Sequence, residues 1–416
     1  MQRFAGISRK ILRVWRNEGA MGLLARILHR KSARHAFGGT PEFAGPMRLR
    51  GALSPGLADM LAVPPLCDFF LSDADQAGPL FWVDPAAEAV AAAGCDCAAL
   101  CFTALGRLRD FLAAGRDVTG AALASAVLLV ATEACVAAAA EAGFPPGRVF
   151  HLPSQEGPDA FRAGLIRWLI AAGAIAPELT PPGIRAEWFP GLGGLQPDAR
   201  LCLSLPEAVE RRRRFRSLGL TDFTLFPGLR YSPAWQGAAM SYALMARAAM
   251  AQGAVPLTIC EDDLIPGADF RTRLASVHSY LQENPGWDVF SGLLTNLAEG
   301  TRVTRVVRQE GQMLIHLDFT TGMVFNIYNA RALEHLSRWQ RSGGDVAVNT
   351  IDDWLGQLPG LQVVTSLPFL VGHDSGQRST IFGFSNQRYD RVIEASARRL
   401  ARLVEEFEAK EAAARF

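Results

Sequence analysis

The chain has 416 residues, of which 49% are hydrophobic and 20% are charged, and its formal net charge at pH 7 is +1. This composition is typical of a globular protein with enough material for two domains, and the near-zero charge gives no argument for nucleic-acid binding. Seven cysteines, most of them in apolar segments, indicate reduced thiols in a cytoplasmic protein. No run approaches the ~20 apolar residues of a membrane span, and no signal peptide is evident.

Residues 1–35 contain nine Lys or Arg and a single acid, Glu18, with apolar residues at helical spacing. They predict a basic amphipathic helical segment. Such a segment either lies on the anionic inner face of the plasma membrane, as a peripheral contact, or docks on the protein with its arginines in water. Residues 36–64 are rich in Gly and Pro and predict a linker.

Residues 65–175 alternate between strand and helix patterns and predict a Rossmann-like α/β domain with a parallel sheet. No G-x-G-x-x-G follows the first strand, so nothing specifies a dinucleotide. A docking module, a second binding site and a second enzyme all remain open for this region. The expected strands are 79–84, 98–103, 126–132 and 148–152, and the expected helices are 86–93, 108–114, 133–142 and 159–172.

Residues 176–198 hold five prolines and four glycines and predict an interdomain linker, so a second α/β domain is expected to begin near residue 199. It has a strand at 200–205, followed by a helix at 206–218 that carries an uninterrupted basic run, Arg211–Arg214. These arginines either meet a diphosphate or form a solvated face. The other expected elements are strands at 221–226, 255–260 and 287–294, helices at 235–252 and 268–283, a hairpin at 301–316 and a C-terminal helix over 391–416.

The apolar strand 255–260 ends in three acids, Glu261, Asp262 and Asp263. A strand cannot bury three adjacent carboxylates without partners, so it is expected to deliver them to the carboxyl edge of a sheet, where α/β enzymes bind ligands. Oxygen ligands suit a hard divalent cation, Mg²⁺ or Mn²⁺, which commonly bridges phosphate oxygens. The alternative is an acidic turn that caps the next helix.

Six features in order give residues 199–390 a family resemblance: the opening strand with its arginine-rich helix, then ICEDD, WDVFSG, TGMVFNIYNA, IDDWL and PFLVGHDSGQRSTI. The segment resembles glycosyltransferase family 25, the lipooligosaccharide-type galactosyltransferases with a GT-A-like fold. Two positions depart from the family pattern. Tyr242 stands where the family has a histidine, and Ser204, Leu205 and Pro206 replace an Asn-Leu-Asp turn.

The resemblance implies roles for individual residues. Asp263, with Glu261, Asp262 and His373, would hold the cation on the diphosphate of a nucleotide-sugar, although His373 as a structural histidine is an equal alternative. One of Asp352 and Asp353 would be the general base on the acceptor hydroxyl, unless both only cap the helix that they begin. Three further residues, Arg211, Ser241 and Arg378, would contact the donor.

The sequence therefore predicts a metal-dependent glycosyltransferase that moves a hexose, from the resemblance galactose of a UDP-sugar, to a glycan or lipid-linked acceptor with inversion. Lipopolysaccharide or capsule synthesis is the implied setting. The hairpin at 301–316 would be a flap near the acceptor, and the C-terminal helix frays or packs in a homodimer. The alternative function is a non-catalytic GT-A-like scaffold in envelope-polysaccharide assembly, which Tyr242 keeps open.

Overall fold

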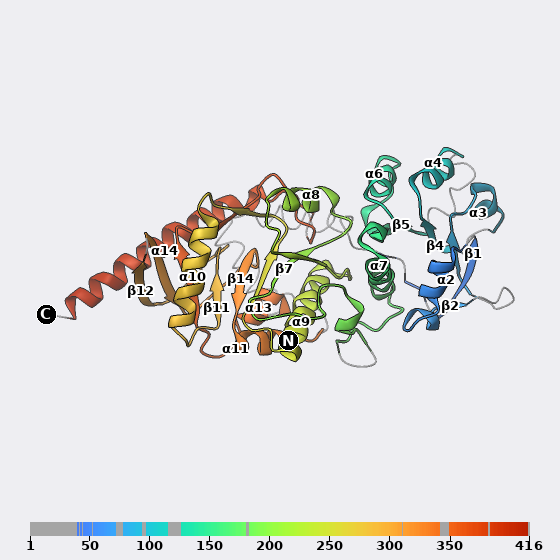
Figure 1. Ribbon diagram of the computed structural model, residues 1–416. Helices are drawn as coiled ribbons and strands as arrows, with labels where there is room; N and C mark the ends of the chain where they lie inside the picture. Colours follow the sequence, from blue (N-terminus) through green and yellow to red (C-terminus); the bar gives the residue numbers. More distant parts are fainter. Residues whose placement is uncertain are drawn as a thin grey trace, which may run out of the picture.

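The computed structural model describes residues 40, 42–43, 45–51, 53–71, 78–93, 97–114, 126–179, 183–309, 311–341, 349–381 and 383–414. The predicted helical segment 1–35 lies outside these residues. The fold is α/β, built on a six-stranded sheet and an eight-stranded sheet that follow one another along the chain (Figure 1). No helix in the described ranges is long and apolar enough to cross a membrane.

All strands of the six-stranded sheet run parallel, in the order β2-β1-β3-β4-β5-β6. Its elements, here named the N-terminal unit, are β1 (Met47–Gly51), α2 (Pro55–Leu61), β2 (Phe70–Leu71), β3 (Leu80–Val83), α3 (Ala87–Ala93), β4 (Cys97–Phe102), α4 (Leu105–Ala113), β5 (Val127–Val130), α6 (Glu133–Glu141), β6 (Val149–His151) and α7 (Pro158–Ala171). Alternate residues of each strand enter two cores. One core includes α3, α4 and α6, and the other includes α2 and α7.

The parallel sheet predicted for residues 65–175 is confirmed, but the prediction that residues 36–64 are a linker is wrong. They contain β1, which pairs with both β2 and β3 inside the sheet, and α2. Leu57 and Leu61 of this helix are buried. The prolines and glycines that indicated a linker lie in the turns around these two short elements, where a helix start at Pro55 tolerates proline.

The eight-stranded sheet is mixed, in the order β12-β13-β15-β11-β14-β9-β7-β8. Strands β8, β7 and β9 are parallel neighbours, while β14 runs antiparallel between β9 and β11. The elements around this sheet are β7 (Arg200–Ser204), α8 (Val209–Ser217), β8 (Thr224–Pro227), α9 (Ala234–Gln252), β9 (Leu257–Glu261), α10 (Phe270–Glu283), β11 (Val289–Ser291), β12 (Val303–Gln309), β13 (Gln312–Leu317), β14 (Phe325–Tyr328), α11 (Ala330–Ser337), α13 (Ile351–Leu355) and β15 (Val363–Leu367).

Helix α9 is almost wholly buried because its many alanines let it lie close to its neighbours. The hydroxyl of Tyr242, in the middle of this helix, donates to the carbonyl of Met323 at 3.0 Å. This buried position fits a tyrosine because its polar end has a partner. Tyr242 therefore has a structural role in the core.

The hairpin expected at 301–316 is present as β12 and β13, but it is not a separate flap. Strand β13 pairs with β15, so the hairpin forms the edge of the eight-stranded sheet. A second small sheet pairs β10 (Leu264–Pro266) with β16 (Val371–His373). The expected C-terminal helix is α14 (Gln387–Ala413), which packs beside β12 and extends past that edge (Figure 1).

Candidate functional site

A cavity of about 890 Å³ opens at the carboxyl ends of β7 and β9. All its lining residues lie between Leu203 and Arg399. Parallel strands end at the same edge of a sheet, which is where α/β proteins place their ligands. Eight of the nine residues that the sequence singled out line this cavity: Arg211, Ser241, Glu261, Asp262, Asp263, Asp352, Asp353 and His373.

The acidic wall of the cavity is the end of β9. Glu261 is the last residue of this strand, and Asp262 and Asp263 form the turn that leads into β10. The backbone carbonyl of Asp263 accepts from the amide of Asp374 at 2.8 Å, which fixes this turn against the end of β16. Both aspartates are almost completely buried, and Glu261 is half-buried.

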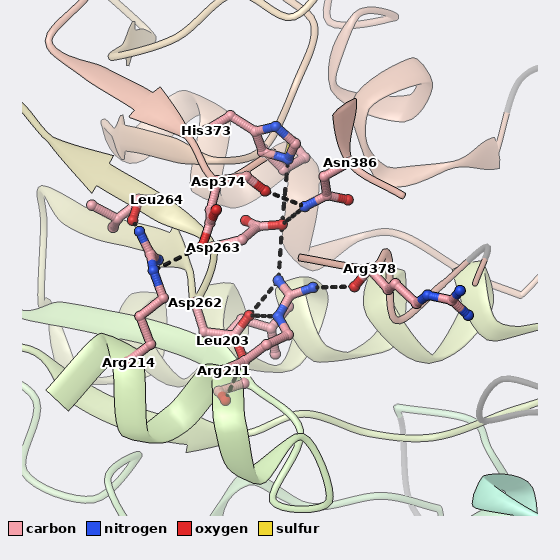
Figure 2. Close-up of polar contacts among 12 residues, drawn as sticks. Leu203, Arg211, Arg214, Asp262, Asp263, Leu264, His373, Asp374, Arg378 and Asn386 are labelled. Atoms are coloured by element: carbon pink, nitrogen blue, oxygen red, sulfur yellow. Dashed lines mark hydrogen bonds and ion pairs between the residues drawn. The ribbon is translucent and has the colours of Figure 1, made fainter. Parts of the chain in front are cut away.

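The guanidinium of Arg211, on α8, lies between the two buried aspartates (Figure 2). Its Nη2 atom is 2.5 Å from Oδ1 of Asp262 and 2.9 Å from Oδ2 of Asp263. The other oxygen of Asp262 accepts a 2.6 Å hydrogen bond from the hydroxyl of Ser204, at the end of β7. Both oxygens of Asp262 are therefore engaged within the protein.

Asp263 has a different set of partners. Its Oδ2 atom accepts from the side-chain amide of Asn386 at 2.9 Å and lies 3.4 Å from Nε2 of His373. Its Oδ1 atom is buried with no hydrogen-bond partner among the described residues, and so is Nδ1 of His373. A buried polar atom without a partner is costly, so each of these two atoms has an unused capacity for a hydrogen bond.

The three acids differ in their affinity for protons. Burial, together with the charges of Asp263, Asp262 and Asp352, raises the pKa of Glu261 from 4.5 to about 8 despite the nearby Arg211. Burial alone would raise the pKa of Asp263 too, but Arg211 and His373 outweigh it and lower that pKa below its usual range. Burial also raises the pKa of Asp262, so among the three acids only Asp263 has its pKa lowered.

As arranged, these side chains do not form a cation site. No group of three His, Cys, Asp or Glu in the described part of the chain has the arrangement of metal ligands. Arg211 already occupies the space between the carboxylates and supplies their counter-charge. Binding of a divalent cation by Glu261, Asp262, Asp263 and His373 stays a prediction, and it requires Arg211 to release a carboxylate.

Asp352 and Asp353 begin the short helix α13 and have different surroundings. The hydroxyl of Thr350 donates to Oδ2 of Asp353 at 2.7 Å, which ties this carboxylate to the start of its own helix. Among the described residues, Asp352 accepts one long contact, 3.4 Å, from the hydroxyl of Thr321. Its charge raises the pKa of Glu261. Both acids line the cavity, and in the described structure Asp352 is held less closely than Asp353.

The two other residues predicted to contact the donor, Ser241 and Arg378, form hydrogen bonds that involve backbone groups. The hydroxyl of Ser241 donates to the carbonyl of Gly237 and accepts from the amide of Leu229, both at 2.8 Å, so it holds a loop of the cavity wall. The carbonyl of Arg378 accepts from Nη1 of Arg211 at 2.9 Å, while its side chain points away from the acids (Figure 2). Arg378 is the predicted residue that does not line the cavity.

Sequence reasoning did not assign three residues of this cluster to the site: Ser204, Asn386 and Asp374. Asp374 forms an ion pair with Arg214 of the basic run, and their atoms are 2.7 Å apart. Ser204 could have been predicted, because it ends a strand expected to be parallel to β9 and so lies at the same edge of the sheet. Asn386 could not have been predicted, since it is 123 positions away from Asp263 in the sequence and no local pattern marks it. Comparison with known protein families and with curated proteins finds no match for this chain.

Proposed function

We propose that this protein is a nucleotide-sugar-dependent glycosyltransferase with a GT-A-like domain at residues 199–390 and a Rossmann-like domain before it. One observation carries the proposal. The acids at the end of β9 and Asp352 at the start of α13 line the same cavity, close enough for Asp352 to shift the pKa of Glu261. The mixed sheet, with antiparallel β14 beside β9, is compatible with the resemblance in sequence.

The donor binds between the ends of β7, β8 and β9. Tyr231 and Trp235 on this side of the cavity offer aromatic surface to a nucleoside. Arg211 provides positive charge for the diphosphate, and its guanidinium can pair with phosphate oxygens as it does with carboxylates. UDP-hexose, with galactose as the sugar, is the donor that the family resemblance favours.

Asp352 acts as the general base. It removes the proton of the acceptor hydroxyl, the hydroxyl oxygen attacks the anomeric carbon, and the bond from this carbon to the diphosphate breaks with the electron pair leaving on the diphosphate. Attack opposite to the leaving group inverts the anomeric centre. Asp353 takes no part, because Thr350 ties it to the helix start.

The setting of the reaction rests on the sequence. A glycan or lipid-linked acceptor in lipopolysaccharide or capsule synthesis fits the family resemblance. The basic residues 1–35 would bring a cytoplasmic enzyme to the inner face of the plasma membrane as a peripheral contact. The charged outer face of α14, where it extends past the sheet edge, is where a homodimer contact is proposed.

A non-catalytic scaffold is the second candidate, and one observation favours it. Arg211 already pairs with both Asp262 and Asp263, so each carboxylate has a positive partner without any ligand. In that case the cavity would bind a glycan or nothing, and no nucleotide would stabilise the protein.

Thermal unfolding with a panel of nucleotide diphosphates and UDP-sugars, each with and without Mn²⁺, separates the two candidates. A ligand at a hundredfold above its dissociation constant adds about 2.7 kcal/mol to the free energy of unfolding, which raises the melting temperature visibly. The transferase predicts a rise with uridine nucleotides that exceeds the rise with adenosine nucleotides. The scaffold predicts no rise with any member of the panel.

A further inference from the structure

Two loops border one side of the cavity: the β7 loop, residues 205–208, of which Leu205 lines the cavity, and the β8 loop, residues 228–231, all of which line it. They are joined to each other, because the amide of Gly228 donates to the carbonyl of Ser204 at 3.0 Å. A Cβ atom on Gly228 would lie 3.0 Å from the side chain of Leu203 and 3.3 Å from that of Leu205. The two loops therefore make a single close-packed surface.

No described residue of the N-terminal unit lines the cavity, yet one of its side chains binds both loops on the side away from the cavity. Arg167 of α7 is fully buried. Its two Nη atoms donate to the two carboxylate oxygens of Glu207 in the β7 loop, both at 3.0 Å. Its Nε atom donates to the carbonyl of Gly228 in the β8 loop at 2.8 Å. A single guanidinium thus fixes the position of each loop relative to the other.

The end of β6 adds a second attachment. The amide of His151 donates to Oε1 of Glu207 at 3.0 Å, and Nδ1 of the same histidine is 3.2 Å from the carbonyl of Pro206. From the β8 loop, Arg230 donates to the carbonyls of Val149 and Gly147 at 2.6 and 2.7 Å. Each of these four contacts joins the β6 region to one of the two loops.

Such a network specifies one arrangement of the loops. Both loops lack regular secondary structure, so few backbone hydrogen bonds of their own hold them. A bidentate pair of arginine and carboxylate has a fixed planar geometry, and the Arg167–Glu207 pair is buried on both sides. Buried ionic groups contribute little net stability but penalise every arrangement in which they are unpaired.

We infer that the N-terminal unit fixes the position of the two loops against which the nucleotide binds. Arg167 and Glu207 are the positioning residues for these loops. The inference rests on the proposed function for the identity of the ligand, but the positioning of the loops is independent of it. Neither residue touches the ligand. Their effect is on the shape of the cavity wall.

The first test compares hydrogen exchange in the full chain of wild type, R167M and R216M. Arg216 is a matched control because it joins α8 to Glu133 and Glu156 of the N-terminal unit without touching either loop. In R167M we expect the amides of Ala208, Gly228 and Leu229 to exchange about tenfold faster or more, since their loop loses its anchor. In R216M we expect them to stay within about twofold of wild type.

The second test measures the dissociation constant of UDP with Mn²⁺, by calorimetry, for the same proteins and for R167M/E207Q. The double variant removes the unpaired buried carboxylate, so its melting temperature should recover relative to R167M. Its affinity for UDP should not recover and should stay about tenfold or more below that of wild type. It also replaces R167M in both tests if the single variant does not fold.

Exchange at the three loop amides decides the inference. Rates in R167M equal to those of wild type, or equal to those of R216M, would overturn it. Recovery of UDP affinity together with melting temperature in R167M/E207Q would overturn it as well, because the pair would then act only on stability. If wild type itself binds no UDP, the proposed function fails, and the exchange comparison still decides the role of the N-terminal unit.

Discussion

The charge of the acidic wall depends on Arg211, whose guanidinium is shared by Asp262 and Asp263. Both carboxylates lie almost entirely out of water, and ions cannot be kept there without a counter-charge. The family resemblance names Arg211 from the run of four as a donor contact, but the sequence does not show that it pairs with these aspartates. Its position facing the end of β9 sets it apart.

Replacement of Arg211 by Gln should make the stability of the protein depend on divalent cations. Breaking a buried ion pair costs about 3–5 kcal/mol because the partner charges are left unpaired. In R211Q, Mn²⁺ can take over as counter-charge for Asp262 and Asp263, so thermal unfolding should show a low melting temperature that rises with added Mn²⁺. The control R213Q, which loses only exposed contacts to Glu133 and Glu210, should behave as wild type. An R211Q protein whose response to Mn²⁺ equals that of wild type would contradict this role.

Asp352 and Asp353 should separate in function although they are neighbours in sequence. In D352N, release of UDP from a UDP-sugar in the presence of acceptor should fall by about 10²–10⁴-fold, the usual contribution of a general base, while UDP still binds. In D353A the same rate should change little, and stability should fall by about 1 kcal/mol because the start of α13 loses the contact with Thr350. Equal losses of rate in both variants would show that Asp352 has no special role.

Glu207 should contribute stability that depends on pH. Burial opposes its ionisation, but Arg167 and Arg230 lower its pKa from 4.5 to about 2. Since one pKa unit corresponds to about 1.4 kcal/mol, the ionised form contributes about 3 kcal/mol, fully present above pH 4.5 and lost as the pH falls towards 2. The difference in free energy of unfolding between wild type and E207Q, from urea titrations, should shrink over this range. A difference that is constant from pH 7 to pH 2.5 would refute the assignment.

Among the elements, helix α8 contacts the candidate site with one face and the N-terminal unit with another. Arg211 and Arg214, three positions apart, point to Asp262 and Asp374 at the site, whereas Arg212 and Arg216, four apart, meet Glu156 of the N-terminal unit. Residues at these spacings share a face of a helix. The sequence predicted a diphosphate contact or a solvated face for Arg211–Arg214. All four arginines form ion pairs within the protein, and the diphosphate contact stays a prediction.

Gly237, in the first turn of α9, lies against the β8 loop. A Cβ atom there would come within 2.5 Å of the carbonyl oxygen of Leu229 and 2.9 Å of the amide of Tyr231, and backbone atoms cannot easily move away. We expect G237A to lose about 1–3 kcal/mol of stability and to bind UDP more weakly, because the loop is displaced. The matched control is G106A, near the start of α4, where a Cβ meets no atom within 4 Å and the helix should be as stable or more so. Urea unfolding and calorimetry with UDP test both variants, and equal behaviour would contradict the close contact.

Periodicity and strand ends could predict much of the architecture. The strands that end in Glu261 and Ser204, and the helices between them, follow from apolar runs and helical spacing. Two kinds of feature could not be predicted. Strand β1 is short and lies among glycines and prolines, so its pattern is weak. Pairs such as Asp263 with Asn386, and Arg167 with Glu207, join residues far apart in sequence, and no local pattern reveals them.

For the molecule as a whole, the largest hydrophobic core passes from one sheet to the other. It includes Trp168 and Leu169 of α7 and continues through Phe189 to Phe226 of β8, with the rings of these two phenylalanines 5.8 Å apart. Figure 1 shows α7 between the strands of the six-stranded sheet and the eight-stranded sheet. A core shared in this way couples the unfolding of the parts that it joins.

Calorimetry of the full chain should therefore show one cooperative transition, even though a chain of this length commonly divides into independent domains. Separate unfolding of the N-terminal unit would expose the apolar surface that α7 covers and remove Arg167 from Glu207. In R167M the single transition should split or broaden, because part of the coupling is lost, whereas R216M should keep one sharp transition. Two well-separated transitions in wild type would mean that the shared core contributes too little free energy to join the two sheets.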